Sequence, residues 1–243
     1  MQFLKNKILI FLIFCIFPDF LSAQFINYEN LSISLSGNYI SSASIQIYSN
    51  STDPIERNQI VDTKGGFGFG ISLRKKFFSD DISICISSEY LRIIDDDLYQ
   101  IVSNDSNIKR FSAEEDLEAF PVELSVLYKL PEFISSTDIL IGGGIGTYFG
   151  SRIRKFANLQ TETISTSPEL TIHIVFNLKY FLTSRLAVNF DLRFREGKYN
   201  VKSKFPTNSI IINDEVYFFP QEYDSKIYID GMKIGVGLSY TIN

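Results

Sequence analysis

Hydrophobic and polar residues alternate along the segment "LAVNFDLRFR" (186–195). Every second residue is bulky and apolar, and the residues between them are small, polar or charged. A period of two residues is typical of a β-strand whose two faces differ. We therefore predict a β-strand here, with one face that avoids water and another that carries charge.

The same alternation recurs along the rest of the chain. It continues weakly from the first segment through Ile45 and Ile47, so that strand is expected to be long, bent or broken. Together with 186–195, the pattern predicts eight strands and an all-β fold; the other seven segments are 31–36, 66–78, 81–90, 119–130, 139–150, 169–181 and 232–242.

The connections between these segments are alternately short and long. The short ones lie near 79–81, 131–137 and 183–185, and the long ones are expected at 41–65, 95–117, 151–168 and 196–227. In an antiparallel up-and-down barrel, this order places all short turns at one end and all long loops at the other. That asymmetry is typical of bacterial outer-membrane barrels.

Side-chain volume indicates which face points inward. The interior of an eight-stranded barrel is just wide enough for side chains to fill. The apolar faces carry too many Ile, Leu, Val, Phe and Tyr side chains for such a space, whereas the opposite faces are rich in Gly, Ser and Thr. We therefore expect the apolar faces to point outward, where only lipid covers so continuous a band. The prediction is an eight-stranded antiparallel up-and-down transmembrane β-barrel.

Charged residues then fall on the inward face. An unpaired buried charge is costly, so each acid is expected to find a base. We expect Arg74 and Lys129 to be candidate partners of Glu89 and Glu123. The structural interpretation is an ion-paired interior, and the functional alternative is a narrow passage for anions; the inward charged residues are Arg74, Lys76, Glu89, Glu123, Lys129, Lys179, Asp191, Arg193, Arg195 and Lys233.

Catalytic and metal-binding signals are weak. His173 is the only histidine, its parity places it in the lumen, and its same-face neighbours Thr171 and Val175 supply no serine for a nucleophile.

One histidine and few cysteines argue against a metal centre. The run Asp95–Asp97 is expected to be a solvated acidic loop rather than a cation site. The glycines at 142–144 and 146 are expected to leave room for bulky lumenal side chains from neighbouring strands. We expect no cofactor and no enzymatic activity.

The N-terminus and the charge limit the location of the protein. Lys5 and Lys7 precede the apolar run Ile8–Phe17, and the small-residue site Leu21–Ala23 follows it. This order predicts a secretory signal peptide over 1–23 and a mature domain over 24–243. The net charge of −5 argues against general nucleic-acid binding.

Three segments resemble a known family. "FPVELSVLYKLP", "LKYFLTSRLAVNFDLRFR" and "GMKIGVGLSYTI" are similar to the small OmpA- and OmpX-like eight-stranded outer-membrane β-barrels of Gram-negative bacteria. The resemblance implies a porin-like cell-envelope protein inserted by the barrel-assembly machinery. One departure is the ending Tyr240–Asn243, where many members of the family carry a terminal aromatic residue.

Two long connections suggest surface contacts. The 95–117 segment is strongly acidic, whereas Arg152, Arg154 and Lys155 directly follow a strand. Arginine pairs with phosphate through forked, charge-assisted hydrogen bonds. The three bases are therefore expected to contact lipid phosphates, with lipopolysaccharide as the candidate lipid. The alternative is that they pair with the acidic segment across the barrel mouth.

The sequence thus predicts a monomeric integral outer-membrane protein with periplasmic termini. Its expected role is structural or one of surface interaction. The alternative role is a narrow solute pore, and a lipid-modifying outer-membrane enzyme is the least favoured class.

Overall fold

The computed structural model describes residues 31–242 except residue 78. The predicted signal peptide therefore lies outside the described residues. Within the described part, no helix combines the length and the apolar character needed to cross a membrane.

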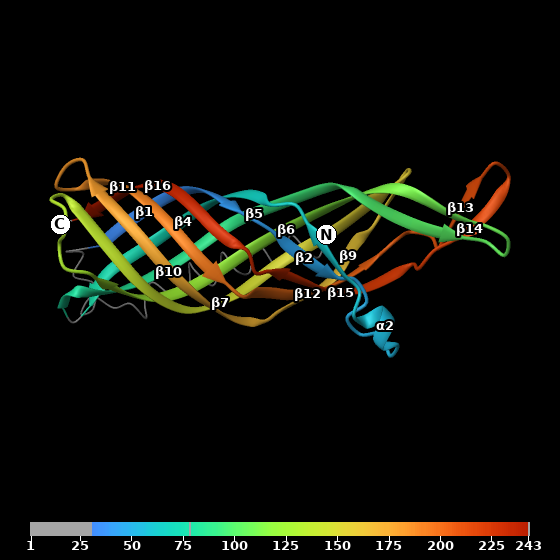
Figure 1. Ribbon diagram of the computed structural model, residues 1–243, viewed down its shortest axis with the longest axis horizontal. Helices are drawn as coiled ribbons and strands as arrows, with labels where there is room; N and C mark the ends of the chain where they lie inside the picture. The colour runs from blue at the N-terminus through green and yellow to red at the C-terminus, as the bar shows by residue number, and fades with distance from the viewer. Residues whose placement is uncertain (1–30, 78, 243) are drawn as a thin grey trace, which may run out of the picture.

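Eight strands close into a ring (Figure 1). The ring closes because β1 pairs on one side with β4 and on the other with β16, and because β5 also pairs with β6. This confirms the predicted antiparallel barrel. In chain order, its strands are β1 (Leu31–Ile40), β4 (Gly66–Phe77), β5 (Ser79–Ser103), β6 (Ile108–Lys129), β7 (Thr137–Phe156), β10 (Leu170–Phe181), β11 (Leu186–Arg195) and β16 (Met232–Ile242).

The apolar face of each barrel strand points away from the interior. Phe69 on β4 is 76% exposed and Ile174 on β10 is 66% exposed, whereas the inward residues Ser125 and His173 are buried. A lipid environment covers an exposed apolar band of this extent. Exposed apolar side chains occur on every barrel strand, and include Leu35, Phe67, Phe69, Ile86, Val126, Ile145, Ile174, Phe190 and Leu238.

The short connections lie at one end of the barrel, and the last residues of β16 lie at the same end. Leu31 pairs with Ile242, Leu186 pairs with Tyr240, and the β6–β7 and β10–β11 turns meet where the Phe181 amide donates to the Ser136 carbonyl. In Figure 1 this end lies at the left.

The other end continues into a second β structure, where long loops were expected. The loop prediction is wrong for most of 95–117, 151–168 and 196–227, because β5, β6 and β7 run far beyond the barrel and a five-stranded sheet lies against them. We call this part the distal extension (Figure 1, right). The second sheet contains, in order, β3 (Ile60–Thr63), β2 (Ala43–Gln46), β15 (Glu222–Ile229), β12 (Gly197–Lys204) and β9 (Glu162–Pro168).

Three short strands and one helix complete the extension. They are β8 (Leu159–Gln160), the hairpin of β13 (Ser209–Ile212) and β14 (Glu215–Phe218), and the helix α2 (Pro54–Arg57), which Asp53 caps by accepting a hydrogen bond from the Ile55 amide at 2.8 Å.

The buried face changes chemical character along β5. Near the turns, its inward residues include Ser87 and Glu89, but the next inward residues are Leu91 and Ile93. Over the same stretch the outward face gains charge, beginning at Arg92. The barrel is therefore apolar outside, whereas the extension is apolar inside, as in a water-soluble β-sandwich.

Two apolar cores fill the extension. The first contains Tyr148, Tyr199 and Ile227 and lies directly beyond the barrel interior. The second includes Phe156, Phe205 and Phe219, whose rings pack edge to face with centroids 5.0 to 5.3 Å apart. Aromatic rings favour this geometry, and each buries a large apolar area. The distal segments are therefore held as a packed structure.

Close strand packing explains the glycines of β7. A side chain at Gly142 or Gly144 would collide with backbone carbonyls of β6, and one at Gly146 would meet Glu123 Cγ at 2.7 Å. Room for a lumenal side chain, which was expected to explain the whole run, therefore applies to Gly146. At Gly142 the reason is backbone approach, and at Gly144 backbone approach adds to the room that the Ser125 and His173 side chains need.

Phe205→Ala should destabilise the distal extension. Phe205 is fully buried, and removing a buried Phe side chain costs about 3–5 kcal/mol. The matched control is Phe218→Ala, since Phe218 is exposed on β14. Limited proteolysis should cut the extension of Phe205→Ala faster while the barrel strands stay protected. Equal cleavage rates for the two variants would contradict the second core.

Candidate functional site

A buried ion cluster fills the middle of the barrel. Glu89 from β5 accepts from Arg195 Nη1 at 2.5 Å and lies 3.0 Å from Lys233 Nζ. Glu123 from β6 pairs with Arg193 and lies 3.9 Å from Arg195 Nη1. Thus β5, β6, β11 and β16 each contribute charged side chains to the same region of the barrel interior.

Neutral donors and a third acid complete this cluster. Tyr148 Oη donates to Glu123 Oε1 at 2.7 Å, and Asn38 Nδ2 donates to Glu89 Oε2 at 2.9 Å. Asp191 lies 3.5 Å from Lys233 Nζ and 3.6 Å from an Arg193 nitrogen. Three acids therefore face three bases, so the charge of the cluster is balanced without an added ion.

The predicted partners of Glu89 and Glu123 are wrong. Gly70, not Arg74, lies opposite Glu89 on β4, and Lys129 is six positions along β6 from Glu123, which is about 20 Å in a strand. Lys129 instead pairs with Asp138 at 2.6 Å near the turns.

Two more predicted lumenal cations lie near the turn end. Arg74 has a buried Nη1 atom without a hydrogen-bond partner among the described residues, and Lys179 is also buried. An apolar layer that includes Cys85 and Leu127 packs at the same level. These two cations line the same central cavity as the cluster, but neither forms an ion pair with its three acids.

Side chains leave little free space inside the barrel. The central cavity has a volume of about 60 Å³, and it is lined by Glu89, Glu123, Asp191 and Arg193 among others. Beyond the cluster, the first apolar core covers the interior with Leu91 and its neighbours. A solute would have to displace ion pairs and then an apolar core to pass.

A serine and the histidine meet inside the barrel, which the sequence reasoning missed. Ser125 Oγ and His173 Nε2 are 2.7 Å apart and buried. Both residues lie opposite Gly144, on its two neighbouring strands, so the absence of a side chain there lets them meet across β7. Counting from the short β6–β7 turn could have placed Ser125 opposite Gly144, but β7 and β10 are joined by a long connection, so the position of His173 could not be counted in this way. His173 Nδ1 has no partner among the described residues, so no acid orients the ring.

Two of the three bases expected at lipid phosphates, Arg152 and Arg154, are buried instead, whereas Lys155 is partly exposed. Arg152 is 0% exposed and donates to Glu115 through Nε at 3.0 Å and Nη2 at 2.7 Å. Arg154 also pairs with Glu115, and Lys155 pairs with Glu114 at 2.7 Å. The prediction of a phosphate contact by Arg152 and Arg154 is wrong, because β7 continues past the barrel and turns both guanidinium groups inward. The alternative pairing with the acidic 95–117 segment is what the structure shows.

The acidic run on β5 already holds a cation from the chain. Lys64 Nζ lies 2.6 Å from Asp96 and 2.7 Å from Asp97, and its backbone amide donates to Asp95 at 3.0 Å. The hydrogen bonds to Asp96 and Asp97 raise the pKa of Lys64, which keeps the ammonium charged. These carboxylates therefore belong to a β-bulge of the extension, where the pairing of β5 with β6 shifts register, and not to an open loop.

Comparison with solved structures identifies the same architecture elsewhere. The outer-membrane protein OprG from Pseudomonas aeruginosa is similar with a TM-score of 0.56 and 10% identity, over 87% of this chain and 95% of OprG. Neisserial surface protein A has a TM-score of 0.44 at 10% identity, over 88% of this chain and 98% of that protein. No protein-family model matches the sequence, and no curated protein matches it. At this identity, the likeness to OprG concerns the fold.

Glu123→Gln should destabilise the barrel more than Glu114→Gln. Glu123 is buried against two arginines, and removing one partner of a buried pair costs about 3–5 kcal/mol. Glu114 forms a partly exposed pair with Lys155, for which about 0–1 kcal/mol is typical. Urea unfolding in lipid vesicles measures both. Equal midpoints would show that Glu123 is solvated.

Proposed function

We propose that this chain, which has the fold of the small eight-stranded outer-membrane β-barrels, is an integral outer-membrane protein with a structural or surface-interaction role. The barrel supplies the anchor, and the distal extension supplies a surface held outside the membrane. The observation that carries this proposal is the filled barrel interior, with a central cavity of about 60 Å³.

Two belts of aromatic residues support the membrane placement. Towards the extension, Tyr90 packs against Phe120 with ring centroids 5.1 Å apart, at the level where the buried face changes from polar to apolar. Near the turns, Tyr128, Tyr180 and Tyr240 are exposed. Outer-membrane barrels carry such girdles at both interfaces. On β6, Phe120 and Tyr128 of the two belts bound about nine residues, a length suited to a tilted spanning strand.

The asymmetry of the ends supports an orientation. Outer-membrane barrels have short periplasmic turns and longer segments outside the cell. We therefore place the turns and both termini in the periplasm and the distal extension at the cell surface. Outer-membrane lipid, including lipopolysaccharide, surrounds the barrel in this proposal, the barrel-assembly machinery inserts it, and the closed ring functions as a monomer.

The pore and enzyme alternatives fit the interior less well. Three ion-paired acids and an apolar core block the route that a solute would take. The Ser125–His173 pair is buried, and its imidazole has no orienting acid among the described residues, unlike that of a catalytic triad. In the proposed function, both groups are structural.

Planar-bilayer recordings test the filled interior. Purified protein added to a planar lipid bilayer should give no stepwise conductance, because the central cluster closes the lumen. Insertion of the same preparation into vesicles, shown by heat-modifiable gel mobility, is the control. Stable open steps from inserted protein would favour the pore.

Leu238→Arg should block insertion into lipid vesicles. Leu238 is exposed on the outer face of β16, and an arginine at the bilayer midplane costs about 2–4 kcal/mol. The neighbouring change Ser239→Ala alters an inward residue and is the matched control. The inserted fraction, measured by heat-modifiable mobility, should fall for Leu238→Arg alone. Greater damage from Ser239→Ala would invert the assignment of faces.

A further inference from the structure

A second and larger cavity lies in the distal extension. Its volume is about 500 Å³, within the range of small-molecule sites, and its walls include Tyr48, Tyr99, Arg154, Phe218 and Tyr223. It is separate from the barrel interior, since the 60 Å³ cavity shares none of these residues.

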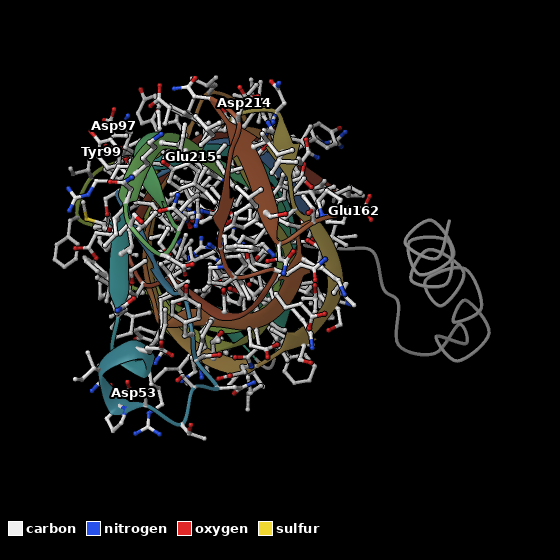
Figure 2. All side chains as sticks on the ribbon, turned by 90° about the vertical axis from the view of Figure 1, so that its right-hand side faces the viewer. Asp53, Asp97, Tyr99, Glu162, Asp214 and Glu215 are labelled. Carbon is white, nitrogen blue, oxygen red and sulfur yellow. The ribbon has the colours of Figure 1, made fainter. Side chains whose placement is uncertain are left out.

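The cavity opens at a seam between the two sheets. Beyond Arg92, β5 has left its partner β4, and β14 pairs with β5 only at Phe218 and Ser103. The cavity lies between this open edge and the segment that carries α2. Figure 2, viewed along the barrel from this end, shows Tyr99 of β5 and Asp53 of the α2 segment on the same side of the molecule.

Aromatic rings form the walls of the cavity. Tyr48 and Tyr223 stack with centroids 5.7 Å apart and an interplanar angle of 26°. Tyr99 and Phe218 are exposed at the opening, at 64% and 54%. Such walls favour a ligand with a flat or aliphatic apolar body.

A guanidinium group with spare hydrogen-bond donors lies in the same cavity. Arg154 is buried; its Nε donates to Gln100 Oε1 at 2.8 Å, its Nη2 to the Tyr99 carbonyl at 2.7 Å, and its Nη1 to Glu115. Arginine has five N–H donors. Two of them have no acceptor among the described residues.

The buried charges around Arg154 do not balance. Arg152 and Arg154 share a single carboxylate, that of Glu115, so the cluster carries one excess positive charge. Burial raises the pKa of Tyr223 to about 12, so its phenol stays neutral. Glu56 of α2 is exposed to solvent and accepts a hydrogen bond from Ser51 at 2.9 Å. Its charge therefore compensates that of Arg154 only weakly. An excess buried charge favours binding of an anion.

We propose that this cavity binds a small organic anion with one carboxylate on an apolar body. The carboxylate accepts from the free N–H groups of Arg154 and compensates the excess charge. The apolar body lies between Tyr48, Tyr99 and Phe218. This site does not depend on the membrane role of the barrel, because all of its residues belong to the distal extension.

Calorimetric titration with naphthoate tests the proposal. The full chain is reconstituted in lipid nanodiscs, empty nanodiscs correct for partitioning, and naphthylmethanol serves as the uncharged probe of similar shape. Naphthoate should bind saturably, and naphthylmethanol should bind about tenfold or more weakly because it lacks the charge-assisted hydrogen bonds.

Three variants locate the binding. Arg154→Gln should weaken naphthoate binding about tenfold or more, whereas Arg92→Gln, at an arginine paired with Asp116 outside the cavity, should leave it unchanged. Tyr99→Ser alters an exposed wall residue, should also weaken binding, and replaces Arg154→Gln as the deciding variant if the latter fails to fold. Absence of saturable naphthoate binding would overturn the proposal. Equal affinity for naphthylmethanol, or binding unchanged in Tyr99→Ser, would do the same.

Discussion

The narrow interior of a closed eight-stranded ring is the constraint on which this structure depends. Such a ring encloses only enough space for side chains. Bulky apolar residues therefore lie outside, where Phe69 and Ile174 are exposed, and glycine, serine and charged residues lie inside. The charges have little water around them, so Glu89 and Glu123 need arginine partners from the opposite wall.

Buried ion clusters and apolar cores follow one another along the axis. The central cluster around Glu123 is followed by the first apolar core, then by the cluster around Glu115, and the second core packs beside that cluster. The reversal of faces near Tyr90 makes this order possible, because beyond the membrane the exposed surface meets water and the interior no longer has to be polar. One continuous strand, β5, thus belongs to an inverted barrel and to a conventional sandwich.

Because side chains fill the barrel interior, the groups that a ligand could reach lie in the distal extension. Within the barrel, Ser125 and His173 are enclosed, and their contact reflects strand register across Gly144. In the extension, the open edge of β5 leaves a cavity where aromatic walls and Arg154 meet. In the proposed function, a barrel with a filled interior and a packed extension that carries a cavity together suit a surface-interaction role.

The sequence by itself determined the barrel, because a period of two shows which residues share a face and the volume of the apolar face excludes it from a narrow lumen. The segment "GKYNVKSK" (197–204) also alternates, but its apolar residues are few, so the sequence alone predicts a loop where the structure has the strand β12. Only the tertiary structure decided the partners of Glu123 and the burial of Arg152. Periodicity assigns a residue to a face, whereas an ion pair depends on how far along its own strand each charge lies, and that offset is fixed by register and tilt when the ring closes.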